Sequence, residues 1–134
     1  MSMLYRFDIK NGDLFISSAT NGEVIWTGKP KGYDVTQVLP IVGSNDCIVL
    51  LDWLKTGLEN QKNLLRLDSH GFTVWEVGDP PKGFVYGIER GVETESYTGI
   101  TGIDKIQVTA FSYSCFSDQI ELGSGNIIKS EFVK

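Results

Sequence analysis

Apolar and polar residues alternate along much of the chain, with the period of two that is typical of β-strands buried on one face. The clearest example is the stretch Asn63–Val77, where two short apolar runs flank the polar turn Asp68–Gly71. The apolar positions of this stretch are Leu65, Leu67, Phe72 and Val74. Because glycine adopts positive φ without steric cost, Gly71 favours a tight turn, and the pattern predicts a β-hairpin around which the chain is organised.

Two further stretches have the same pattern, Asp13–Trp26 and Asp118–Ile128, with turns at Asn21-Gly22 and Gly123–Gly125. Leu4–Ile9 predicts a first strand, and it is followed by Asn11-Gly12, a strong signal for a two-residue hairpin turn. The first 26 residues therefore predict a three-stranded meander.

The middle of the chain contains the most apolar segment, Cys47–Leu51, which predicts a strand buried on both faces. Before it, Asp34–Val42 is extended but contains Pro40, which favours an edge strand or an irregular crossing. After it, Asp52–Lys62 has leucines at helical spacing but also Gly57, which costs about 1 kcal/mol in a helix. We expect a long hairpin loop there, with at most one helical turn.

The second half continues with strands. Val85–Glu89 predicts one strand, Arg90–Asp104 a strand with a loop-like extension, and Lys105–Tyr113 an alternating strand. In the last of these we expect Ile106, Val108 and Ala110 to share a face. The whole chain, residues 1–134, therefore predicts a single all-β domain, an antiparallel meander of about 8–10 strands with little helix, built as propeller-like blades or as a two-sheet sandwich.

The three hairpins form an internal repeat. Gly71 lies 49 residues after Gly22, Gly125 lies 54 residues after Gly71, and Trp26 and Trp75 are also 49 apart. Each of these two tryptophans closes a hairpin, which indicates core or rim packing. The hairpins resemble blades of the quinoprotein-like β-propellers, whose pattern is an apolar strand, Asp, a turn with Gly and an apolar strand ending in Trp. The resemblance implies blade-like sheets and does not imply quinone binding.

Composition and charge argue against a disordered chain, a membrane-spanning protein and a nucleic-acid-binding protein. Apolar residues make up 41% and charged residues 22%, which argues against disorder, and no apolar run approaches the roughly 20 residues that cross a bilayer. The net charge of −5 disfavours nucleic acids and anionic membranes as partners and is compatible with a basic protein. Since Met1–Asp8 lacks the features of a signal peptide, we expect a cytoplasmic protein.

No pattern of catalytic or metal-binding residues stands out. Cys47 and Cys115 lie in apolar runs, where reduced, buried thiols are expected; a disulfide would need an oxidising compartment. The single histidine, His70, lies in a turn, and a metal site would need further ligands at matching spacing. Glu93 and Glu95 stand among threonines and serines, as in a solvated loop. We therefore expect no enzyme, no cofactor and no metal.

Acidic and aromatic residues in the loops suggest a protein interface, because tryptophan and tyrosine often dominate binding energy. The candidates for partner binding form two groups in the sequence. They are Asp52, Trp53 and Glu59, and Glu93, Glu95 and Tyr97. For each of them, a place at the edge of the core is the alternative.

The chain also resembles small bacterial immunity proteins of polymorphic toxin systems, including contact-dependent growth inhibition. The resemblance is carried by Asn63–Asp68 with Gly71 and Val74-Trp75, and by the ending Ser130–Lys134. It implies a protein that neutralises a toxin domain, such as a nuclease with a basic cleft, by covering its active site. Two rivals stay open: a module that binds a small ligand or a glycan, and an enzyme of unrecognised type that uses His70.

Overall fold

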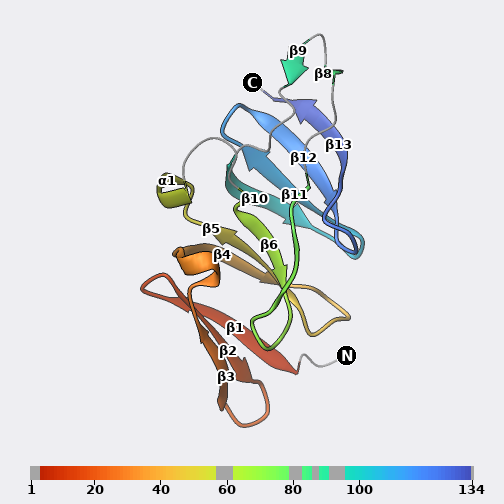
Figure 1. Cartoon of the computed structure of the whole chain (residues 1–134). Helices are drawn as coiled ribbons and strands as arrows, with labels where there is room; N and C mark the ends of the chain where they lie inside the picture. The colour runs from red at the N-terminus through yellow and green to blue at the C-terminus, as the bar shows by residue number, and fades with distance from the viewer. Residues whose placement is uncertain (1–3, 57–61, 79–82, 86–87, 91–95, 134) are drawn as a thin grey trace.

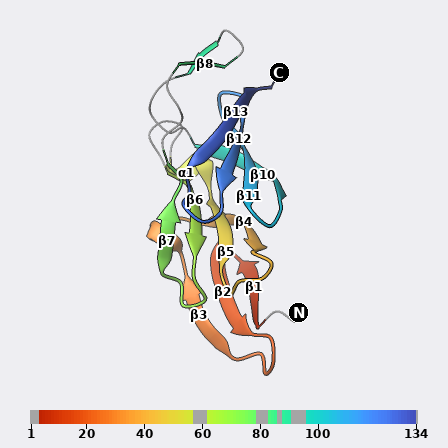
Figure 2. The ribbon, with the colours of Figure 1, turned by 90° about the vertical axis from the view of Figure 1, so that its right-hand side faces the viewer.

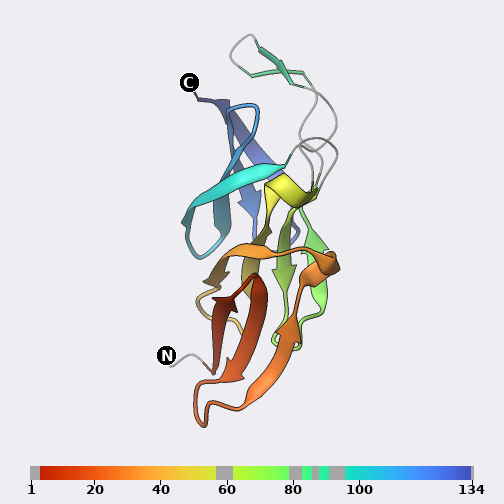
Figure 3. The same ribbon diagram turned by 90° about the vertical axis from the view of Figure 1, so that its left-hand side faces the viewer.

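The protein is a stack of small antiparallel sheets, seen in a computed structural model that describes residues 4–56, 62–78, 83–85, 88–90 and 96–133. Three sheets follow one another along the long axis of the molecule, and each is a meander of strands that are consecutive in sequence (Figures 1, 2 and 3). The all-β, antiparallel meander expected from the alternation is confirmed. The separate sheets favour the blade-like form over a single sandwich.

The first sheet contains β1 (Tyr5–Lys10), β2 (Asp13–Ser18) and β3 (Val24–Gly28), in that order. Between β1 and β2, Asn11 and Gly12 have φ values of 51° and 80°, as a two-residue hairpin turn requires. The three-stranded meander predicted for the start of the chain is confirmed.

The second sheet has the order β4 (Val35–Pro40), β5 (Cys47–Leu51), β6 (Leu64–Leu67) and β7 (Thr73–Glu76). A single 3₁₀ turn, η1 (Pro30–Gly32), leads into it, and α1 (Trp53–Thr56) follows β5. β4 is an edge strand, as Pro40 indicated, and all five residues of β5 are buried. The one helical turn allowed after Asp52 is also present.

The third sheet has the order β10 (Tyr97–Ile103), β11 (Gln107–Ser112), β12 (Phe116–Glu121) and β13 (Ile127–Phe132). In the sequence, β8 (Gly83–Val85) and β9 (Ile88–Arg90) come between the second and third sheets and form a two-stranded ribbon. The single strand expected over Val85–Glu89 is therefore wrong, because the chain reverses there. The described part of the chain contains thirteen strands, more than expected, since several are only three or four residues long.

Two cores hold the stack together, one on each side of the second sheet. Alternate residues of β5 point to opposite sides: Cys47, Val49 and Leu51 enter the core with the first sheet, and Ile48 and Leu50 enter the core with the third. Each fully buried leucine or isoleucine contributes about 1.5–3 kcal/mol. This double burial explains why the segment has no polar face.

The repeated tryptophans join neighbouring sheets. The Trp26 indole of β3 lies over Gly71 in the turn of the second sheet, and the Trp75 indole of β7 lies over Gly125 in the turn of the third. A Cβ on Gly125 would come within 2.6 Å of the Trp75 ring, and one on Gly71 would overlap the Trp26 ring. We call this arrangement the indole–glycine contact.

Some apolar residues lie on a different face from the one that alternation predicted. Phe72 and Val74 of the β6–β7 hairpin are exposed, whereas Trp75 is buried against the third sheet. Ile106 is exposed although Val108 and Ala110 are buried. Ile106 lies in a turn before β11, in which the Asp104 carboxylate accepts hydrogen bonds from the amides of Ile106 and Gln107, both at 2.9 Å. The strand and its alternation therefore begin only at Gln107.

Candidate protein-binding surface

Two aromatic side chains meet where the helical turn that follows β5 of the second sheet lies beside a turn of the third sheet. The ring centroids of Trp53 in α1 and Tyr113 in the β11–β12 turn are 5.8 Å apart, with the planes inclined by 36°. Leu54 beside them is 72% exposed and Tyr113 is 52% exposed. We call Trp53, Leu54 and Tyr113 the aromatic patch.

Local hydrogen bonds fix both parts of the aromatic patch. The Asp52 carboxylate accepts a hydrogen bond from the Leu54 amide at 3.0 Å and so caps the start of α1, and the Asp52 amide donates to the carbonyl of Asp34 at 2.8 Å. On the other side, the Tyr113 amide donates to the Ser96 carbonyl at 3.0 Å. The patch is therefore held by backbone from both the second and the third sheet.

Of the predicted interface residues, two lie together at the aromatic patch, and one lies in the core. Asp52 and Trp53 lie at the aromatic patch, whereas Glu59, Glu93 and Glu95 lie outside the described residues. Tyr97 is fully buried, so its assignment to a binding surface is corrected: its side chain belongs to the core.

The burial of Tyr97 follows from a polar network in the core between the second and third sheets. Its hydroxyl donates to the carboxylate of the buried Asp118 at 2.6 Å, and Ser130 donates to the other carboxylate oxygen, also at 2.6 Å. Its backbone pairs with the buried Asn63 side chain, which accepts from the Tyr97 amide and donates to the Tyr97 carbonyl, both at 2.8 Å. Buried polar groups need such partners, which fixes the position of β10 against β6.

Sequence reasoning missed Leu54 and Tyr113. In the sequence, Leu54 is one of several leucines at helical spacing, and Tyr113 is the last residue of an alternating strand. The turn that follows Tyr113, in which Cys115 has a φ of 73°, is seen only in the structure.

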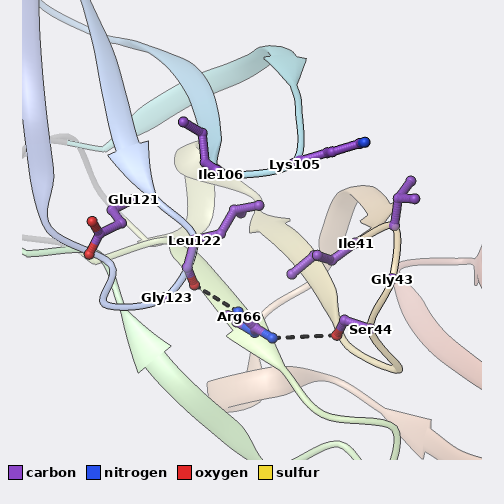
Figure 4. A pocket seen from close by; sticks show the side chains of 10 residues that line it. Ile41, Gly43, Ser44, Arg66, Lys105, Ile106, Glu121, Leu122 and Gly123 are labelled. Carbon is purple, nitrogen blue, oxygen red and sulfur yellow. Dashed lines mark hydrogen bonds between the residues drawn. The ribbon is translucent and has the colours of Figure 1, made fainter.

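A shallow cavity of about 460 Å³ opens between the second and third sheets (Figure 4). We call it the inter-sheet groove; it is lined by Ile41, Val42, Gly43, Ser44, Arg66, Lys105, Ile106, Glu121, Leu122 and Gly123. The Arg66 guanidinium at its floor bonds the Asp46 carboxylate and the Leu122 carbonyl, both at 2.8 Å. Because these contacts neutralise and bind Arg66, its main effect is to tie the two sheets together.

Two groups that could be reactive, the Cys47 thiol and the His70 ring, have no catalytic partner in the part of the chain that the structure describes. Burial, followed by the nearby Asp46 and Asp68, raises the pKa of Cys47 to about 12, so its thiol stays protonated and unreactive at neutral pH. His70 is exposed in the β6–β7 turn, and its backbone amide, not its ring, donates to the Asp68 carboxylate at 2.8 Å.

Among the described residues, no three His, Cys, Asp or Glu side chains gather as metal ligands would. In the same part of the chain, no helix has the length and apolar character of a membrane span.

Comparison with known proteins gives the fold but no family. No protein family and no curated protein matches the chain. Among solved structures, BamB from Moraxella catarrhalis is similar over 97% of this chain, with a TM-score of 0.63 and 16% identity. The computationally designed protein Ika8 is similar over the whole chain, with a TM-score of 0.62 and 10% identity. The β-propeller domain of Myceliophteria thermophila Cps50 (Swd1) is similar over 96%, with a TM-score of 0.54 and 14% identity.

These similarities concern only part of each known structure. The chain spans 34% of BamB, 35% of Ika8 and 40% of the Cps50 domain. At such low identity the comparison bears on architecture alone. The three stacked sheets are therefore β-propeller-like blades, and the hairpin repeat seen in the sequence is the repeat of these blades.

Proposed function

We propose that this protein binds another protein through the aromatic patch and that it acts as an immunity protein against a toxin domain. The observation that carries the proposal is the contact between the half-buried Trp53 and the exposed Tyr113, which meet across two blades with the exposed Leu54 beside them. Tryptophan and tyrosine supply much of the energy of protein interfaces when they enter a pocket of the partner. The patch offers such anchors on a rigid support.

Charge supports a basic partner. The chain has a net charge of −5, and Asp52 lies directly before the aromatic patch. The other predicted acids are adjacent to it in sequence: Glu59 follows α1, and Glu93 and Glu95 precede Ser96, whose carbonyl binds the Tyr113 amide. A basic cleft that binds phosphates would attract such acids and would be blocked when the aromatic side chains dock beside it.

The test is binding of the toxin-like domain encoded beside this gene, measured by calorimetry and by association kinetics. We expect Trp53→Ala and Tyr113→Ala each to weaken binding by about 2 kcal/mol, roughly 30-fold. Phe72→Ala is the control, because Phe72 is an exposed aromatic residue outside the aromatic patch, in the β6–β7 turn. If all three variants bound like the unchanged protein, the aromatic patch would not be the interface.

A second measurement tests the acidic residues. Reversing the charge of Asp52, Glu59, Glu93 and Glu95 together should slow association and reduce its dependence on salt, because these acids steer a basic partner. An unchanged association rate at low salt would exclude this role for the four acids.

A small-ligand or glycan-binding module is the second candidate, and the inter-sheet groove is the observation that favours it. Its volume of about 460 Å³ lies in the range of small-molecule sites, roughly 300–1,000 Å³. A ligand that raises the melting temperature of the protein but not that of Ile106→Asp, a change at the exposed wall of the groove, would support this candidate over toxin binding.

A further inference from the structure

The turns between the first two strands of the second and third sheets carry two of the most exposed apolar side chains in the described chain. Val42 in the β4–β5 turn is 73% exposed, and Ile106 in the β10–β11 turn is 68% exposed. Both line the inter-sheet groove, together with the buried side chains of Ile41 and Leu122 (Figure 4). An apolar side chain placed in the groove would therefore cover surface that now faces water.

Hydrogen bonds hold both walls of the groove in place. In the β4–β5 turn, the Ile41 amide donates to the Asp46 carbonyl at 3.0 Å. In the opposite wall, the Leu122 amide donates to the Ile106 carbonyl at 2.9 Å. Arg66 joins the walls, because it bonds both the Leu122 carbonyl and the Asp46 carboxylate. The groove is therefore preformed, and a segment that binds there does not have to order it.

Two charged side chains flank the apolar centre of the groove. Lys105 and Glu121 lie on opposite sides of Leu122 (Figure 4). The Glu121 carboxylate accepts a hydrogen bond from the Ser124 hydroxyl at 2.7 Å. The Lys105 side chain, in contrast, has no hydrogen-bond or ion-pair partner within the residues that the structure describes. Its ammonium group is therefore available to a carboxylate of a partner.

The low walls of the groove favour a peptide segment over a small molecule. Small-molecule sites bury about 70–90% of the surface of their ligand. Walls whose apolar side chains, Val42 and Ile106, are themselves mostly exposed do not enclose a ligand to that extent. An extended peptide needs to bury only one side chain between the walls, while its neighbouring residues lie over the rim.

We propose that the inter-sheet groove is a docking site for an extended segment of a partner protein. The segment places a branched apolar side chain between Val42 and Ile106 and an acidic side chain beside Lys105. The groove adjoins the turns that precede β5 and β11, whereas Trp53 and Tyr113 of the aromatic patch follow these strands. The two sites therefore lie at opposite ends of the same strands, and the groove does not depend on toxin binding.

The test follows the amide chemical shifts of ¹⁵N-labelled protein as a short peptide is added. The probe is the acetylated and amidated peptide Ser-Gly-Glu-Leu-Gly-Ser, which combines an acid with a branched apolar residue. We expect saturable shift changes at the amides of Val42, Gly43 and Ile106. Replacing the glutamate of the peptide by glutamine should weaken binding by about two- to five-fold, as the loss of an exposed ion pair does. Replacing its leucine by alanine should abolish the saturable changes.

A charge swap tests the role of Lys105. The Lys105→Glu protein should prefer the peptide in which lysine replaces glutamate, whereas the unchanged protein prefers the original peptide. Lys10→Glu is the matched control, because Lys10 is also exposed but lies in β1 of the first sheet, and it should keep the original preference.

Two results would overturn the proposal. One is the absence of saturable shift changes at the groove, or a peptide preference that Lys105→Glu leaves unchanged. The other is shift changes at the groove with N-acetylglucosamine but with none of the peptides, which would indicate a small-ligand site instead.

Discussion

Replacing Gly125 by alanine tests whether the indole–glycine contact holds the second and third blades together. The change places a Cβ within 2.6 Å of the Trp75 ring, which is only 8% exposed and donates a hydrogen bond to the Leu122 carbonyl. The ring must therefore move, and with it the packing between the blades. Gly22→Ala is the matched control, because Gly22 has nearly the same φ but no neighbour within 4 Å.

The magnitudes follow from what each variant changes. Both place an L-residue at positive φ, which costs about 1 kcal/mol. Gly125→Ala also loses the indole hydrogen bond, about 1 kcal/mol, and strains a packed interface, about 1–3 kcal/mol. We therefore expect the free energy of unfolding to fall by about 1 kcal/mol in Gly22→Ala and by roughly 3 kcal/mol or more in Gly125→Ala.

Urea unfolding followed by circular dichroism and by tryptophan fluorescence measures both values. Coincident unfolding midpoints for the two probes would show that unfolding is two-state, so that the two free energies can be compared. Equal destabilisation by Gly22→Ala and Gly125→Ala would refute the reasoning, because only Gly125 has an indole ring above it.

Three further predictions concern the cores. Asn63→Ala should lower the free energy of unfolding by roughly 3 kcal/mol, because it leaves the buried Tyr97 amide without its acceptor, and urea unfolding measures it. Tyr97→Phe should lower the free energy of unfolding by about 2 kcal/mol, because the hydrogen bond to Asp118 is lost. Calorimetry should show unchanged toxin binding by the folded variant. A loss of affinity would mean that Tyr97 belongs to the interface. Since burial raises the folded-state pKa of Cys47 to about 12, the folded protein holds this proton above the ordinary value of 9.0, and stability should fall by up to about 1.4 kcal/mol per pH unit between these values. The Cys47→Ala protein should lack this added slope, and an identical pH dependence of the two proteins would contradict the burial of the thiol.

The outcome at the candidate interface shows the limit of local patterns. Trp53 could be placed in an exposed segment because a polar loop follows it, but its pairing with Tyr113 joins residues 60 positions apart in different blades. Tyr97 looked like an interface residue beside Glu93 and Glu95. Only the position of Asn63 and Asp118 from other strands makes it a core residue.

What the sequence alone determined is the local geometry: glycine turns, the period of two, and the repeat that relates Trp26 to Trp75. These features depend on the backbone preferences of a few neighbouring residues, so they can be read in order along the chain. Which face of each strand is buried was decided by the tertiary structure. Phe72 is exposed and Trp75 is buried because the third blade packs against one side of β7, and that blade comes from residues about 50 positions further along.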